Sequence, residues 1–125
     1  MVKLTIAVAL PAVLLAACAH HAEKRPIDLP GAAEIGSYVA AHWGPDFNQR
    51  FSRFATRAGQ SSVFVSVQNA RCGHNWGGTI ADCSYDVTAT FSGGEEVTRQ
   101  LWSEFERGGD GALNEVIIMW HERRR

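Results

Sequence analysis

The stretch Cys83-Ser84-Tyr85-Asp86-Val87-Thr88-Ala89-Thr90-Phe91 carries the clearest structural signal in this chain. Apolar side chains occupy every second position, and polar side chains fill the positions between them. Because successive side chains of a β-strand point to opposite faces of a sheet, this alternation predicts a strand with one buried face. Gly93-Gly94 follows it, and glycine reaches positive φ without a Cβ clash, which favours a tight hairpin turn there.

Three other segments complete a predicted sheet. Residues 63–68 alternate valines with Phe64, Ser66 and Gln68, which predicts a strand before Cys83. Residues 97–105 predict a third strand, although the spacing within them also suits a helix. Glycines at 108, 109 and 111 mark the next turn, and residues 116–120 are rich in β-branched side chains, as expected of a last strand.

The segment before the predicted sheet has helical periodicity. Residues 32–43 place Ile35, Tyr38 and Val39 at spacings of three and four, and Gly44-Pro45 interrupts the pattern. Proline is accepted in the first turn of a helix, so a second helix is predicted directly after it. Its apolar stripe consists of Phe47, Phe51, Phe54 and Ala58, and Gly59 is its expected C-terminal stop.

Arg50, Arg53 and Arg57 lie on another side of the second predicted helix. They are expected to be solvated, and the alternative is an arginine patch for an anionic partner such as a lipid headgroup or a glycan. Since short connections favour neighbouring antiparallel strands, the predicted fold class is α+β. Two N-terminal helices pack on a four-stranded antiparallel β-meander in two layers, and residues 32–125 form a single domain.

The first residues have the pattern of an export signal. Lys3 precedes an apolar run over residues 4–15, which is too short to span about 30 Å of hydrocarbon as a helix. The run ends in Leu15-Ala16-Ala17-Cys18, which resembles the lipobox of bacterial lipoproteins. The resemblance implies a signal peptide over residues 1–17 and cleavage between Ala17 and Cys18. It also implies diacylglycerol on the Cys18 thiol and acylation of the new amino terminus.

A lipidated amino terminus places the protein on a membrane. The absence of aspartate at Ala19 implies the outer membrane and its periplasmic side if the host is Gram-negative, since aspartate there is the retention signal of that lipoprotein family. Residues 18–31 have little apolar content and predict an extended tether. His20-His21 within it is expected to be plain linker, and the alternative is a weak metal-binding pair. No cofactor other than the lipid is expected, and no metal site.

Charge narrows the range of partners. The chain carries 12 basic and 13 acidic side chains and a net charge of −1, which argues against nucleic-acid binding. Arg123-Arg124-Arg125 is the one basic run in the sequence. It is expected to be a solvated terminus, with a weak contact to anionic lipid as the alternative.

With Cys18 acylated, the sequence leaves Cys72 and Cys83 as a pair in a compartment that permits oxidation. They are expected to form a disulfide that closes the loop over residues 73–82. A redox or metal role is the alternative. The spacing of the two cysteines is not CxxC, and a zinc site would need more ligands than the nearby His74 supplies.

The closed loop displays His74, Asn75 and Trp76 among glycines, and these three are the candidate partner-binding residues. The alternative is that Trp76 folds back to cap the edge of the domain. No motif of a known catalytic family is present, and no catalytic residue is assigned. The weaker enzyme hypotheses rest on His74 with Asp82 as base and orienter and on the carboxylate pairs at 95–96 and at 104 and 106, which are expected to be exposed.

The expected function is that of a membrane-tethered, periplasmic, non-enzymatic module that binds or scaffolds an envelope protein. A small lipid- or glycan-binding lipoprotein is the second hypothesis, and an envelope hydrolase is the third. In the order of its elements, the chain resembles the small outer-membrane lipoprotein of the β-barrel assembly machinery and the β-lactamase-inhibitor-protein fold. Because fold does not carry function, only Cys18 is transferred from a family.

Overall fold

The computed structural model describes residues 25–117, except the side chains of Trp76 and Ile117. The predicted signal peptide, Cys18, the His20-His21 pair and the Arg123-Arg124-Arg125 run lie outside the described residues. The expectations that concern them therefore stay predictions.

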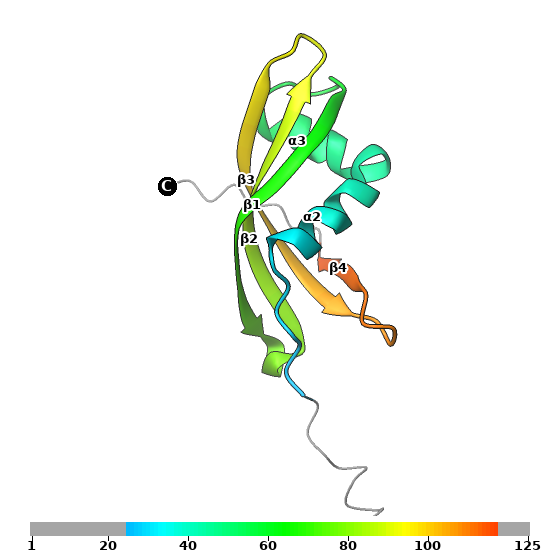
Figure 1. Cartoon of the computed structure of the whole chain (residues 1–125), viewed down its shortest axis with the longest axis vertical. Coiled ribbons are helices and arrows are strands. Elements are labelled where there is room, and N and C mark those ends of the chain that lie inside the picture. The colour runs from blue at the N-terminus through cyan, green and yellow to red at the C-terminus, as the bar shows by residue number, and fades with distance from the viewer. Residues whose placement is uncertain (1–24, 118–125) are drawn as a thin grey trace, which may run out of the picture.

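Four antiparallel strands form one sheet in the order β1-β2-β3-β4 (Figure 1). Strand β1 spans Ser62–Asn75, β2 spans Ile80–Phe91, β3 spans Glu96–Arg107 and β4 spans Leu113–Ile117. Together with helices α2 (Ala32–Ala41) and α3 (Asn48–Phe54), the sheet confirms the predicted α+β class. Between β2 and β3 the turn at Gly94 has φ +84°, as the sequence predicted for Gly93-Gly94.

The alternation in β2 separates the two faces of the sheet. Its odd-numbered residues from Ala81 to Phe91 are buried, and its even-numbered residues are half-buried on the opposite face. We call this opposite side the outer face. It comprises the even-numbered residues of β2 and their cross-strand partners in β3, which run from Glu96 beside Thr90 to Glu104 beside Asp82. An antiparallel sheet with one polar face produces this pattern.

Strand β1 departs from strict alternation. Its register with β2 shifts between Phe64 and Ser66, which leaves Val65 as the extra residue of a β-bulge. Phe64 packs against Trp43, with 5.4 Å between the ring centroids, whereas Val63 and Val65 are 70% and 49% exposed. The regular period of the valines therefore ends at this bulge.

Strand β4 begins at Leu113, three residues before the predicted start at Val116. Leu113 is 7% exposed and joins the core, and Glu115 lies opposite Phe105. Residues 118–120 of the predicted strand lie outside the described residues. The β-branched composition indicated the strand type but not its start, because the strand opens with Leu-Asn-Glu.

Gly44-Pro45 does not separate the two helices. A π-helical turn, η1, spans Trp43–Phe47 and connects α2 to α3. Because Pro45 has no N–H to donate within the helix, the chain widens by one residue, and the Phe47 N–H reaches the carbonyl oxygen of His42 at 3.2 Å. The turn buries Trp43, whose indole N–H donates to the carbonyl of Ser62 at 2.9 Å.

Helix α3 ends at Phe54, earlier than the predicted stop at Gly59. Thr56 takes a left-handed φ of +57°, and the Arg57 N–H closes onto the carbonyl of Ser52 at 2.7 Å. This geometry is that of a Schellman-type helix end, so Ala58 is exposed rather than part of the apolar stripe. Phe47 and Phe51 are fully buried, as the stripe predicted.

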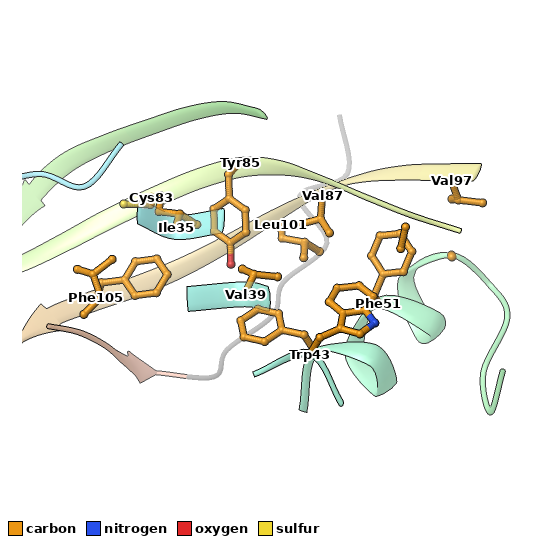
Figure 2. Close-up of a cluster of buried hydrophobic side chains, with 14 of the residues drawn as sticks. Ile35, Val39, Trp43, Phe51, Cys83, Tyr85, Val87, Val97, Leu101 and Phe105 are labelled. Carbon is orange, nitrogen blue, oxygen red and sulfur yellow. The ribbon is translucent and has the colours of Figure 1, made fainter. Parts of the chain in front are cut away.

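The core is one cluster to which both helices and the sheet contribute (Figure 2). Ile35, Val39, Trp43 and Phe51 come from the helical segment, and they meet Tyr85, Leu101 and Phe105 from the strands. Aromatic contacts join the two sets: Phe51 stacks on Phe91 at 5.9 Å, and Tyr38 meets the edge of Phe105 at 5.4 Å.

Arg50 enters this core rather than solvent, which contradicts the expected basic side. Its guanidinium donates to Glu115 at 2.7 Å and to Asp46, and Glu115 in turn accepts from the Ser103 hydroxyl at 2.8 Å. The hydroxyls of Ser103 and Tyr85 share a buried hydrogen bond of 2.7 Å.

The other predicted members of the basic side do not gather with Arg50. Arg57 pairs with Glu95 and lies over the ring of Phe91, while Arg53 is exposed. The predicted arginine patch is therefore not formed.

Ionisation in this polar network follows from burial and pairing. Burial lowers the pKa of Arg50, but its hydrogen bonds to Asp46 and Glu115 outweigh that cost and raise the pKa overall. Burial raises the pKa of Tyr85, which keeps the phenol protonated. The network thus ties α3 to β2, β3 and β4 through one cation, one buried carboxylate and two hydroxyls.

Replacing the buried carboxylate by Glu115→Gln should lower the free energy of unfolding by about 2–3 kcal/mol, because it leaves part of a desolvated guanidinium without its anion. The matched control is Asp46→Asn, since Asp46 contacts the same guanidinium but is 44% exposed, against 4% for Glu115. The control should lower it by less than about 1 kcal/mol. Urea unfolding followed by fluorescence measures both, and equal losses would contradict the role of burial.

Candidate functional site

Cys72 and Cys83 form the predicted disulfide, with an S–S distance of 1.99 Å. The two residues lie directly opposite each other in β1 and β2, and their Cα atoms are 4.1 Å apart. Cys83 is fully buried. The disulfide therefore closes the loop over residues 73–82 at its base, and it leaves neither cysteine as a thiol for redox or metal chemistry.

The closed loop turns through a short 3-10 helix, η2, over Trp76–Gly78. Gly77 and Gly78 take φ values of +68° and +88°, which other residues rarely adopt. A Cβ at Gly78 would also lie 3.3 Å from the Cβ of Pro26. Glycine is thus required here both by the turn and by the close approach of the N-terminal segment.

Residues 25–31 run along the sheet from the closed loop to the start of α2 (Figure 1). The Ile27 N–H donates to the carbonyl of Gly78 at 2.7 Å, and the side chain of Ile27 is 9% exposed. Pro30 is also buried, and its carbonyl oxygen lies 3.4 Å from the sulfur of Cys72. The extended form agrees with the predicted tether, but this part of it packs against the domain instead of running free.

The predicted partner-binding residues have structural partners of their own. The Nε2 atom of His74 hydrogen-bonds to the carbonyl of Ile27 at 2.8 Å, so this ring helps to hold the N-terminal segment. Asn75 is half-buried and also has an interaction partner. The side chain of Trp76 lies outside the described part of the chain, so its contact with a partner stays a prediction.

Arg107 fixes the other side of the docked segment, and sequence reasoning did not single it out. Its guanidinium pairs with both carboxylate oxygens of Glu34, each at 2.7 Å. It also donates to the carbonyls of Asp28, at 3.1 and 2.9 Å, and of Gly111, at 2.8 Å. An arginine just before a Gly-Gly-Asp-Gly turn was the available signal, but its partners lie far away in the sequence.

The Arg107–Glu34 pair shifts the ionisation of both groups. Hydrogen bonds from Arg107 lower the pKa of Glu34, and those same bonds raise the pKa of Arg107. The guanidinium donates to Glu34 and to two backbone carbonyls. Arg107 therefore has a structural role, and we call its pair with Glu34 a clamp.

A shallow groove of about 360 Å³ lies between the docked segment and the β3–β4 turn. Its walls come from residues 25–28 on one side and from Arg107 with three turn glycines on the other, and Thr79 contributes from the closed loop. The groove is open to solvent. It lies at the same end of the sheet as the disulfide-closed loop.

The residues behind the enzyme hypotheses do not come together. His74 pairs with Ala81 and Asp82 with Gly73, so their side chains belong to opposite faces of the sheet. Asp82 instead accepts a hydrogen bond from the indole of Trp102. Of the predicted exposed pair on β3, Glu106 is exposed, but Glu104 is 6% exposed, which corrects that expectation. Glu95 pairs with Arg57.

A comparison with known protein families, curated proteins and solved structures finds no match to this chain. The resemblances in architecture and in the lipobox therefore stay predictions. Within residues 25–117, no helix has the length and apolarity needed to cross a membrane, and no three metal-ligating side chains gather at one point.

Removing the disulfide with the double variant Cys72→Ala/Cys83→Ala should lower the free energy of unfolding by about 3 kcal/mol. The reason is the loop entropy returned to the unfolded chain when a closure with a sequence separation of 11 residues is opened. Urea unfolding without reductant measures the loss. A wild-type protein in which both cysteines react with a thiol reagent under native, oxidising conditions would contradict the pairing.

The Arg107–Glu34 clamp predicts a pH dependence. Because the folded-state pKa of Glu34 is lowered, its contribution is present above the pH where a free glutamate titrates, about 4.3, and is lost as the pH falls through the folded value. Glu34→Gln should therefore cost about 0.5 kcal/mol near pH 7, a small value because Glu34 is 42% exposed, and nothing near pH 2.

Thermal unfolding across this pH range measures the difference between wild type and variant. Glu96→Gln, an exposed carboxylate at the far end of β3, is the control and should show no such convergence. A difference that stays constant from pH 7 to pH 2 would contradict the clamp.

Proposed function

We propose that this protein is a membrane-tethered, non-enzymatic module of the cell envelope that binds another envelope protein. Lipid on Cys18 would hold it at the periplasmic face of the outer membrane in a Gram-negative host. In this proposal the helices and residues 25–31 form one layer over the apolar face of the sheet. The end of the outer face beside the β2–β3 turn is left for contact with the partner.

The docked segment supports an orientation for the tethered domain. The N-terminal segment already contacts the domain at Pro26 and Ile27, beside the closed loop. Fewer than ten residues then separate Cys18 from the domain, and an extended chain of that length spans about 25–30 Å at most. The closed loop and the groove would thus face the membrane, and the turn between β2 and β3 would point away from it.

The observation that carries the protein-binding proposal is the exposure of two valines at that distant end. Val63 is 70% exposed and Val65 is 49% exposed, and Val63 lies opposite Thr90, next to the β2–β3 turn. Thr88 and Thr98 continue the surface and hydrogen-bond to each other at 2.7 Å. We call these residues, Val63, Val65, Thr88, Thr90 and Thr98, the distal patch.

The chemistry of the distal patch favours a protein over a small ligand. Its five side chains are β-branched and uncharged, with the exposed Glu96 at their border opposite Thr90. Depletion of charge is a feature of the centre of protein interfaces. The bulge at Val65 also twists the edge of β1, which disfavours addition of a further strand there. The partner is therefore expected to pack on the face of the sheet rather than to extend it.

A small lipid or glycan is the second candidate, and the groove beside Arg107 is the observation that favours it. The groove would face the membrane in the proposed orientation. Its main cation is already paired with Glu34, however, and the space between helices and sheet is filled by core side chains. Protein binding through the distal patch is therefore the better supported function.

A photo-crosslinking amino acid at Val63, in cells, should give one discrete crosslinked product of defined mass. The same probe at Gln49, which is exposed on α3 away from the outer face, is the positional control and should give none. Adding Val65→Lys should lower the yield of the crosslinked product at least ten-fold, since a charge would be buried against the partner. Substitution of such an exposed residue is expected to leave folding intact within about 0.5 kcal/mol.

The tether is tested in the same cells. Cys18→Ser should block lipidation and reduce the Val63 crosslink, because the tether raises the local concentration of the module near its partner. A crosslink of equal strength at Gln49 and Val63, or one that Val65→Lys leaves unchanged, would contradict the distal patch. Incorporation of labelled palmitate into Cys18→Ser would contradict the lipid anchor.

A further inference from the structure

Glu104 is a buried carboxylate that forms no ion pair with any of residues 25–117. It is 6% exposed, and its Oε2 atom is buried and accepts no hydrogen bond. By register it belongs to the outer face, directly opposite Asp82 of β2. Two carboxylates at directly opposed positions repel each other, and a buried charge needs a partner to be stable.

The outer face as a whole is acidic. Besides Glu104 it carries Asp82, Asp86 and Glu96. Glu106 continues the same side of β3, and Arg71 of β1, opposite Ser84, is the basic residue beside this face among the described residues. The ion pairs seen within residues 25–117 involve other residues, such as Arg50 with Glu115 and Arg107 with Glu34. The described arginines thus mostly pair with other carboxylates. Asp82 accepts from the indole of Trp102 and Asp86 from the amide of Asn69, but the ion pairs within residues 25–117 include no acid of this face.

The register of β4 places the end of the described chain beside this carboxylate. Ile117, the last described residue, lies opposite Glu104. Beyond it the sequence continues with Ile-Met-Trp-His-Glu at 118–122 and then Arg123-Arg124-Arg125. Arg123 follows Ile117 after five intervening residues, which allows a reach of up to about 20 Å, whereas neighbouring strands are only about 5 Å apart.

We propose that the C-terminal arginines, Arg123-Arg124-Arg125, bind the outer face of this protein's own sheet and neutralise Glu104 and Asp82. Three consecutive guanidinium groups carry the charge opposite to that of the two adjacent carboxylates, and the fork of arginine donors suits a carboxylate in two-point contact. The tail then holds β4, the shortest strand, against the sheet. This inference is independent of the lipid anchor and of the distal patch.

A double-mutant design in the full-length protein tests the pairing through a change of sign. In the intact chain, Glu104→Gln should lower the urea midpoint, because it removes the anion that the arginines neutralise. In a chain that ends at Glu122, the same substitution should raise the midpoint, because it then removes a buried charge without a partner. Glu96→Gln, on the same face but exposed, is the control and should leave both midpoints unchanged.

A second measurement follows the tail itself. Carboxypeptidase B removes C-terminal arginines, and mass spectrometry reports the rate. Release should be several-fold faster from Glu104→Gln than from wild type or from Glu96→Gln. If Glu104→Gln fails to fold, replacing the three arginines by glutamine gives the reverse test: 0.5 M NaCl should lower the midpoint of wild type and leave that of this variant unchanged.

Three outcomes would overturn the proposal. The first is an effect of Glu104→Gln with the same sign and size in the intact and shortened chains. The second is an equal rate of arginine release from all three proteins. The third is a rise in midpoint on adding calcium that requires Glu104 but not the tail, which would assign the carboxylates to a cation instead.

Discussion

The arrangement of this domain follows from the length of its sheet. Strands β2 and β3 have 12 residues each, about 40 Å when extended, whereas helix α2 has 10 residues and is about 15 Å long. Helix α2 is therefore less than half as long as either strand. Residues 25–31 add to the buried side of the sheet, with Ile27 buried beside the closed loop and Pro30 beside the disulfide. The path of the N-terminal segment is therefore part of the fold, and it determines the end of the sheet from which any tether leaves.

The same constraint explains why arginines take on internal roles. A core only two short helices wide has little apolar volume at its margins, so its edges are completed by long side chains with apolar stems and charged heads. Arg50 reaches between α3 and β4 to Glu115, and Arg107 reaches from β3 to Glu34 on α2. Each of these pairs connects elements distant in sequence. Arg50 and Arg107 thus place positive charge on the helical side of the sheet. The outer face carries mainly acidic residues.

Sequence patterns predicted the parts of this structure that depend on local periodicity. The alternation in β2, the glycine turn after it, the phenylalanine stripe and the Cys72–Cys83 pairing are all present, because each reflects neighbours in the chain or a short closure. What the patterns missed depends on contacts across the fold. The bulge at Val65 accompanies the packing of Phe64 on Trp43. Arg50 points inward because it pairs with Glu115, and His74 is held by its hydrogen bond to the carbonyl of Ile27. No spacing within the sequence encodes those partners.

The capture of His74 also changes how the disulfide-closed loop is interpreted. From the sequence alone, a disulfide-closed loop with a histidine among glycines is typical of a recognition surface. Once His74 and Gly78 are seen to hold the backbone of Ile27, the rigidity has a structural purpose: the loop clamps the incoming chain. The disulfide at the base of the loop joins the two strands that lead into it, and His74 and Gly78 hold the backbone of Ile27 from within this closed segment.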